Sequence, residues 1–334
     1  MKPRSFARPL RPRALAMVVT GVLVLACGTR TALLSDSDIT GIFPGDDSGA
    51  TPRDATTDRS IPPRDASRDS VPGLDVTVTP DAPLPNDCPD AESTFIYVVT
   101  SQNELYSFYP PTLSFKFIGN LACPASPGET PFSMAVDRKG FAYVLFTDGN
   151  LFRVSTKTAA CLPTSYQPNQ LGWSTFGMGF SSDDDGNDQL FVTHDNSNLS
   201  GFSDGLGTIN TQTFRLSSVA TFSPPIVQRA ELTGTGDGRL FAYWPDEASG
   251  QDGAFIAQIN RKDGQVIGAS RIDVGSPHSA FAFAFWGGDF WIFSGDQTQS
   301  SITKYDTGTN TASEVSTIGS TIVGAGVSTC APQQ

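Results

Sequence analysis

Hydrophobic residues after residue 90 fall into short runs that return at a nearly fixed distance. The runs begin at Phe95, Phe141, Leu190, Leu240 and Phe290, with steps of 46, 49, 50 and 50 residues. Gly, Asp and Asn separate further short runs inside each period, which is typical of strands joined by turns. A period near this length that is filled with short strands is typical of β-propeller blades. The sequence therefore predicts an all-β, five-bladed β-propeller over residues 92–334.

The second period shows how one blade is built. Its strands are expected at 132–136, 141–146 and 150–154, with a weaker fourth strand around 159–162. We label the four strands a to d from the axis outward.

Strand a lines a crowded axis, so small residues are expected to recur in it. They do so at Ser133 and Ala135, Gly177 and Gly179, Gly234 and Gly236, Ala282 and Ala284, and Gly324 and Ala325. Large side chains alternate with the small ones at 281–285, which is the period of two expected for packing between blades.

The first period lacks a strand a, and the chain ends with an unassigned strand at 322–327. We expect this last strand to complete blade 1 as its innermost strand, so that the ring closes without open edges. The closure places Cys88 and Cys330 close together, and it predicts a Cys88–Cys330 disulfide. Cys123 and Cys161 would then form a second bond between blades 1 and 2.

The N-terminus has the features of an export signal, with a basic segment followed by 13 apolar residues at 14–26. The sequence Val24-Leu25-Ala26-Cys27 resembles the lipobox of bacterial lipoproteins. The resemblance implies cleavage of residues 1–26 and a lipid on Cys27, which gives stable membrane anchoring. Gly28 after the cysteine implies the outer membrane of a Gram-negative bacterium, or the cell surface. The alternative is an ordinary signal peptide with an unrelated cysteine.

Residues 27–91 are expected to form a disordered tether behind the lipidated cysteine. Phe43 is the one aromatic residue of 28–91, and Pro and Asp recur throughout that stretch. Low hydrophobicity and net negative charge do not support a packed core. The three predicted regions are therefore 1–26, 27–91 and 92–334.

The charge of the chain narrows the choice of partners. The formal net charge is −12, and removal of the five basic residues of the signal leaves 17 basic against 34 acidic residues. We expect no nucleic acid partner, because phosphate binding needs Lys and Arg patches. We expect contact with the membrane through the lipid, and a monomer.

Strand direction sorts the loops onto two faces. The a–b face carries the a–b and c–d loops, and its a–b turns are short, as at 137–140, 236–238 and 287–288. The b–c face carries the longer b–c and d–a loops, where function is usually found. The ligand-binding candidates on the b–c face are Tyr166, Trp173, His194, Asp195, Trp244, Asp246, Glu247, His278 and Asp296.

Each candidate also has a structural interpretation. His194 with Asp195 and His278 would suit a metal or acid–base site, but two histidines 84 residues apart favour structural roles. Asp246 and Glu247 are candidate carboxylates for catalysis or simple loop acids. Trp173 is the best candidate for an aromatic surface. The acidic run at 183–188 lacks the EF-hand ligand pattern and is expected to be a turn. We predict no metal, no cofactor and no catalytic set.

The segments 132–144 and 238–243 resemble repeats of NHL-type and related bacterial propellers, in which a strand, an Asp/Gly turn and an aromatic strand recur. The resemblance implies the propeller fold. Such propellers include binding scaffolds, lyases and lactonases, and the acidic metal ligands of the lactonases have no clear match here.

Three functions stay open at this point. The leading hypothesis is a membrane-anchored binding module for a glycan, a peptide or an envelope protein. The second is an extracytoplasmic hydrolase or lyase that uses His194, His278 and nearby carboxylates. The third is a structural envelope protein without a small ligand.

Overall fold

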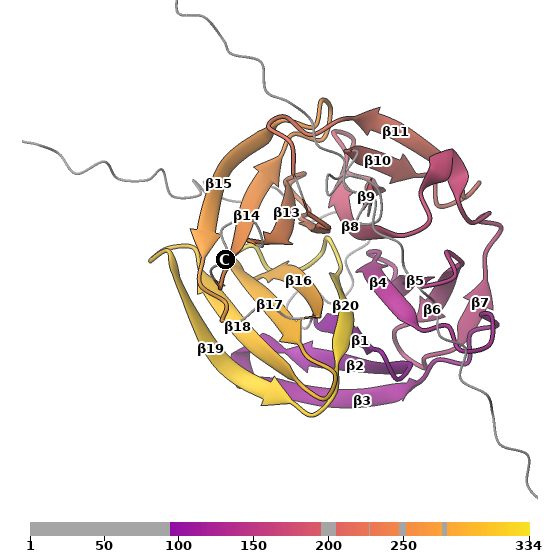
Figure 1. Cartoon of the computed structure of the whole chain (residues 1–334), viewed down its shortest axis with the longest axis horizontal. Helices are drawn as coiled ribbons and strands as arrows, with labels where there is room; N and C mark the ends of the chain where they lie inside the picture. The colour runs from indigo at the N-terminus through magenta and orange to yellow at the C-terminus, as the bar shows by residue number, and fades with distance from the viewer. Residues whose placement is uncertain (1–93, 195–204, 227, 247–251, 276–278) are drawn as a thin grey trace, which may run out of the picture. The chain divides into compact units, whose positions relative to one another are not determined.

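The computed structural model describes residues 94–194, 205–226, 228–246, 252–275 and 279–334. All of them belong to the second of two compact units of the chain, residues 64–334. Strands β1 to β20 form five antiparallel sheets of four strands each. Figure 1 shows these sheets as blades around a common axis. The five-bladed β-propeller predicted from the sequence is confirmed.

In each blade the strands follow the order a, b, c and d from the axis to the rim. Blade 1 consists of β20 (Ile322–Val327), β1 (Ile96–Thr100), β2 (Glu104–Tyr109) and β3 (Ser114–Asn120). Blade 2 consists of β4 (Pro131–Val136), β5 (Phe141–Phe146), β6 (Leu151–Ser155) and β7 (Cys161–Pro163). Blade 3 consists of β8 (Phe176–Ser182), β9 (Asp188–His194), β10 (Leu206–Ile209) and β11 (Leu216–Ala220). Blade 4 consists of β12 (Glu231–Gly234), β13 (Leu240–Pro245), β14 (Ala254–Ile259) and β15 (Val266–Ile272). Blade 5 consists of β16 (Ala280–Trp286), β17 (Asp289–Gly295), β18 (Ser300–Asp306) and β19 (Thr311–Ile318).

Two short 3-10 turns, η2 (Pro110–Thr112) and η3 (Gln170–Gly172), lie in connections. None of the helical segments in the described ranges is long and apolar enough to cross a membrane.

The C-terminal strand closes the ring as predicted. Strand β20 pairs antiparallel with β1, with Val98 opposite Ala325, and becomes the innermost strand of blade 1. It also packs against β4 of blade 2 and β16 of blade 5. Because β1 and β20 come from opposite ends of the propeller sequence, this strand pairing joins the two ends of that sequence in one blade and closes the ring.

The core consists of five hydrophobic clusters, one at each contact between neighbouring blades. Strand β16 shows how alternation builds them. Its residues Phe281, Phe283 and Phe285 pack toward blade 4, whereas Ala282 and Ala284 face blade 1. Each fully buried Phe contributes about 1.5–3 kcal/mol. The period of two therefore becomes a division of side chains between two blade contacts.

Small residues let the innermost strands approach each other at the axis. A Cβ atom on Gly177 of β8 would lie 2.1 Å from the carbonyl oxygen of Ala230, next to β12. A Cβ on Gly179 would lie 2.7 Å from the Leu232 backbone. A Gly177→Ala change would therefore force these two backbones apart and damage the contact between blades 3 and 4.

The predicted bond between Cys123 and Cys161 is present. It joins the segment after β3 to the first residue of β7, and so links blade 1 to blade 2. Cys330 is also disulfide-bonded. Cys88 lies outside the described residues, as do the predicted regions 1–26 and 27–91.

Candidate functional site

The structure brings together two of the predicted binding residues, Trp173 and His194. Their rings stack at a centroid distance of 5.0 Å and an interplanar angle of 8°. The Trp173 side chain is 5% exposed and His194 is 7% exposed. The prediction that Trp173 lies at the surface is wrong, because its ring fills the b–c end of the contact between blades 2 and 3.

Tyr166 belongs to the same buried cluster and packs edge-to-face on Phe176 of β8. Burial raises the pKa of its hydroxyl to about 12. Tyr166 therefore supports the blade contact, and its hydroxyl stays protonated at neutral pH.

Trp244 and Asp246 lie at the end of β13 and also have structural contacts. The ring of Trp244 stacks on Phe255 at 5.5 Å. The Asp246 carboxylate accepts a hydrogen bond of 2.7 Å from Nε of Arg271. Asp246 is 8% exposed, so it is not one of the exposed loop acids of the alternative interpretation.

The remaining predicted residues do not join these groups. Asp296 is exposed, and its Oδ1 accepts hydrogen bonds from the backbone nitrogens of Thr298 and Gln299 in the turn after β17. Asp195, Glu247 and His278 lie outside the described residues. Within the described ranges, no group of three His, Cys, Asp or Glu side chains is placed to hold a metal ion.

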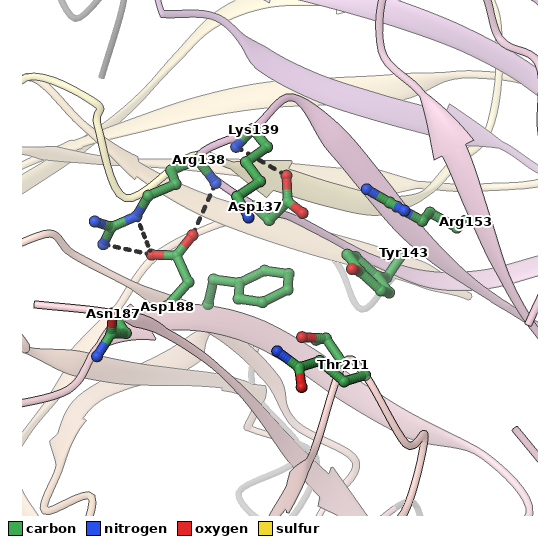
Figure 2. A pocket seen from close by; sticks show the side chains of 10 residues that line it. Asp137, Arg138, Lys139, Tyr143, Arg153, Asn187, Asp188 and Thr211 are labelled. Carbon is green, nitrogen blue, oxygen red and sulfur yellow. Dashed lines mark hydrogen bonds and ion pairs between the residues drawn. The ribbon is translucent and has the colours of Figure 1, made fainter. Parts of the chain in front are cut away.

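A pocket of about 440 Å³ opens on the opposite face, the a–b face, between blades 2 and 3. Figure 2 shows it from close by. The β4–β5 turn, the start of β9 and the loop after β10 surround it, and Tyr143 and Phe180 come from the blade contact below. We call this space the Tyr143 pocket. Its lining residues are Asp137, Arg138, Lys139, Tyr143, Arg153, Phe180, Asn187, Asp188, Thr211 and Gln212.

A buried ion pair forms one wall of the Tyr143 pocket. The guanidinium of Arg138 donates to Oδ1 of Asp188 at 2.7 and 2.9 Å, and the Arg138 backbone nitrogen donates to Oδ2 at 2.8 Å. Thr329, just after β20, donates its hydroxyl to the same Oδ1 at 2.6 Å. The pair therefore ties blade 2, blade 3 and the C-terminal segment together, as the dashed lines between Arg138 and Asp188 in Figure 2 show in part.

Asp137 begins the β4–β5 turn and shapes it. Its Oδ1 accepts hydrogen bonds from the backbone nitrogens of Lys139 at 3.0 Å and Phe141 at 2.9 Å. Gly140 completes the turn at a φ of 78°, which glycine adopts without steric cost. Burial raises the pKa of the Asp137 carboxyl above its ordinary value, and the nearby charge of Asp188 adds to the effect.

Arg153 and Tyr143 are paired across the strands β6 and β5 on the other side of the pocket. The guanidinium of Arg153 lies 3.6 Å above the ring of Phe141, which fixes its plane. Figure 2 shows this guanidinium pointing across the pocket toward Asp137, with Tyr143 beside it. The Arg153 Nε is buried and has no acceptor among the described residues. Tyr143 packs edge-to-face on Phe180, and burial raises the pKa of its hydroxyl.

A second pocket of about 280 Å³ lies on the other side of the β4–β5 turn, between blades 1 and 2. It shares Arg138 and Lys139 with the Tyr143 pocket and adds Lys157 and the backbone around Gly140. The turn therefore separates two hollows that share the same basic residues.

The sequence contained a signal for this site. Arg138 and Lys139 are adjacent basic residues in a turn of an acidic chain, and the turn Asp137–Gly140 was expected only to be tight. Asp188 was placed in an acidic turn, and residues 183–187 do form the β8–β9 turn. What sequence reasoning missed is that Asp188 lies beside Arg138, because the two residues are 50 positions apart and in different blades.

The fold and the pocket define a five-bladed β-propeller with a polar cavity at a blade contact. No protein-family model and no curated protein matches the sequence. Solved structures that are similar include a chain of the nidogen/laminin complex, at 10% identity and a TM-score of 0.46, over 72% of this chain and 100% of that one. A protein of unknown function from Bacteroides caccae has 10% identity and a TM-score of 0.37, over 70% of this chain and 98% of that one.

An oligogalacturonate lyase in complex with manganese has 11% identity and a TM-score of 0.33, over 67% of each chain. These low identities and TM-scores carry no argument about a ligand or an activity.

Proposed function

We propose that this chain is an extracytoplasmic binding module, a β-propeller lipoprotein that a lipid on Cys27 holds at a membrane. The observation that carries the binding role is the Tyr143 pocket, a polar hollow on a rigid blade contact. Its volume is within the range of ligand pockets, roughly 300–1,000 Å³. Candidate partners are a small polar molecule, or a glycan, a peptide or an envelope protein with an end group that fits the pocket.

The hydrogen bonds of the pocket favour binding over catalysis. Asp188 accepts bonds from Arg138 and Thr329, and Asp137 accepts two backbone N–H groups of its own turn. Both carboxylates therefore hold the frame in place. Arg153 and Tyr143 are among the lining side chains that carry hydrogen-bond donors. A rigid frame with inward donors is suited to selecting a ligand.

The proposed location rests on the N-terminal sequence and on the cysteines. The lipobox-like sequence before Cys27 supports lipid anchoring, and Gly28 supports the outer membrane or the cell surface. The Cys123–Cys161 disulfide supports an oxidising compartment outside the cytoplasm. Residues 27–91 would act as a tether that separates the propeller from the membrane.

A hydrolase or lyase is the second candidate, and one observation favours it. Asp137 has a raised pKa and lies in the same pocket as Tyr143. Such shifts in a pocket are typical of acid–base groups. The proton transfer would then depend on Asp137 and not on His194 or His278.

The binding role is tested on the full chain in detergent micelles by a thermal-shift and NMR screen of small sugars, amino acids and organic acids. Tyr143→Phe keeps the ring and removes the hydroxyl, and Tyr106→Phe in blade 1 is the matched control outside the pocket. We expect a bound probe to lose affinity with Tyr143→Phe and not with Tyr106→Phe. The proposed site would be wrong if no probe binds, or if a probe binds Tyr143→Phe as tightly as the wild type.

Anchoring and catalysis have separate tests. Cys27→Ser is expected to abolish incorporation of labelled palmitate and to release the protein from membranes. Retention at the membrane without the lipid would contradict the proposed anchor.

Catalysis is tested by looking for chemical conversion of a bound probe. If the protein converts a probe and Asp137→Asn abolishes the conversion, the hydrolase or lyase replaces the binding module.

A further inference from the structure

Basic residues gather around the β4–β5 turn in a chain that is otherwise acidic. The chain has 34 acidic and 22 basic residues. The two pockets beside the turn are nevertheless lined by four basic side chains and two acidic ones. The basic residues are Arg138, Lys139, Arg153 and Lys157, and the acidic ones are Asp137 and Asp188.

The acidic residues neutralise only part of this charge. Asp188 is paired with Arg138 in the buried ion pair. Arg153 points toward Asp137, and its charge partly offsets the rise that burial causes in the pKa of that carboxyl. Lys139 and Arg153 have no ion pair with an acidic side chain in the described part of the chain. Three basic and two acidic side chains line the Tyr143 pocket itself, so it has an excess of one positive charge.

Arg153 is the basic group whose position is most restricted. The Phe141 ring covers one face of its guanidinium, and pairing of β6 with β5 fixes its backbone. Its Nε is buried without an acceptor among the described residues. Because Nε is covered, a ligand in the pocket would meet the guanidinium at its terminal nitrogens, which Figure 2 shows pointing across the cavity.

The chemistry of a guanidinium selects the ligand group. The two terminal nitrogens of arginine lie along one edge and match the two oxygens of a carboxylate. The neighbouring groups of the pocket are the Tyr143 and Thr211 hydroxyls and the amides of Asn187 and Gln212. Hydroxyl or amide groups on the same ligand would find partners there.

We propose that the Tyr143 pocket binds a small organic acid whose carboxylate lies against Arg153, with Lys139 adding long-range attraction. The inference rests on the proposed binding function and names the ligand class for that same site. The ligand is polar beyond its carboxylate, because most of the side chains around Arg153 carry a hydroxyl, an amide or a charge.

The test compares matched probes that differ only in the acid group. D-Glucuronate is paired with D-glucose and L-lactate with L-lactamide, and inorganic phosphate is a further anion. Binding to the full chain in detergent is measured by calorimetry and NMR. We expect at least one acid to bind ten times more tightly, or better, than its neutral partner, because charge-assisted hydrogen bonds to the fork are roughly twice as strong as neutral ones.

Variants locate the bound carboxylate. Arg153→Gln is expected to weaken the acid by roughly 10- to 100-fold, as expected from loss of charged hydrogen bonds. Arg153→Lys keeps the charge without the fork and should recover only part of the affinity. Lys139→Gln should weaken binding by a few-fold and remove part of its salt dependence. Lys116→Gln, an exposed charge on β3 outside both pockets, is the matched control. Melting temperatures separate lost binding from lost folding.

The outcomes are distinguishable from failure of the proposed function. If the acid and its neutral partner bind with equal affinity, and Tyr143→Phe weakens both, this inference is wrong but the proposed binding module stands. Phosphate that binds as tightly as the best acid would overturn the carboxylate assignment. Acid binding that Arg153→Gln leaves unchanged in a folded protein would overturn the role of Arg153. If none of the probes binds detectably, the proposed binding site itself is wrong.

Discussion

The contact between blades 2 and 3 ends differently on the two faces of the propeller. At the b–c end, Trp173, stacked on His194, and Tyr166 fill the space between the blades. At the a–b end, the same contact opens into the Tyr143 pocket. One hydrophobic cluster therefore has a closed end and an open end.

The length of the loops explains the difference. The connection from β7 to β8 covers residues 164–175 and is long enough to bring its own aromatic side chains back over the blade contact. The β4–β5 and β8–β9 turns are short, and they are held by their own Asx hydrogen bonds. Arg138 crosses from one short turn to Asp188, but neither turn carries an aromatic ring that could cover the blade contact, so the space beside the ion pair stays open. Long loops therefore do not always indicate the side on which a ligand binds.

The largest expected effect is at the closed end. Trp173→Ala should lower the free energy of unfolding by roughly 3–5 kcal/mol, because it leaves a cavity against His194 and the blade contact. Trp173→Phe fills most of this space and should lose clearly less. Urea unfolding, followed by fluorescence, measures both.

Loss of probe binding without loss of stability in Trp173→Ala would contradict the comparison. It would show that the closed end carries a ligand site after all.

The next largest effect concerns the frame of the open end. Asp188→Asn should lower the free energy of unfolding by about 3 kcal/mol, because it leaves the Arg138 charge buried without its counter-charge. The double variant Asp188→Asn with Arg138→Met removes both charges and should recover part of the loss. A double variant that is no more stable than the single one would show that packing, and not charge, dominates here.

The disulfide gives a smaller effect on the same blades. Replacement of Cys123 and Cys161 by Ser should lower the free energy of unfolding by about 2–4 kcal/mol, since the closed loop spans 38 residues. Equilibrium unfolding of the double variant measures it. Reduction also opens the bond at Cys330, so the reduced wild type and the reduced double variant should be equally stable, which is the control.

The Cys88–Cys330 bond remains a prediction. Peptide mapping of the oxidised protein is expected to recover a fragment that joins these two cysteines. A different partner for Cys330 would contradict the disulfide that was expected to lock the closure of the ring.

The smallest effect is the pH dependence of the open end. The folded pKa of Asp137 lies above its ordinary value of 3.8, so the folded state holds this proton more tightly than the unfolded state. Its stabilising effect is complete below pH 3.8 and is lost as the pH rises through the folded pKa. Asp137→Asn keeps the Oδ1 acceptor without the charge. It should be more stable than the wild type at neutral pH, and the difference should shrink as the pH falls.

Unfolding curves of both proteins between acidic and neutral pH test this expectation. A difference that does not shrink toward low pH would show that Asp137 is not the group responsible.

Much of the fold was predictable from particular residues. The starts at Phe95, Phe141, Leu190, Leu240 and Phe290 each lie within two residues of the start of strand b in their blade. Gly177 and Gly179 marked an innermost strand, and the structure shows why, since a Cβ there would strike the next blade. These features repeat at short range along the chain, so they can be detected from the amino-acid sequence alone.

The candidate site was not predictable in the same way. Trp173, His194 and Trp244 were predicted to bind a ligand, but their side chains are buried and pack against neighbouring rings. Loop length and residue type could not reveal whether an aromatic ring turns outward or fills a blade contact.

The amino-acid sequence was enough to predict the five blades, the closure by strand β20 and the pairing of Cys123 with Cys161. It could do so because repeat length, alternation and small residues at the axis are properties of neighbouring positions. Only the tertiary structure decided where the propeller is hollow. Arg138 meets Asp188, and Arg153 faces Asp137, through the packing of whole blades and the lengths of the connections above them. Such distances arise from the ring as a whole, so no local pattern in the chain encodes them.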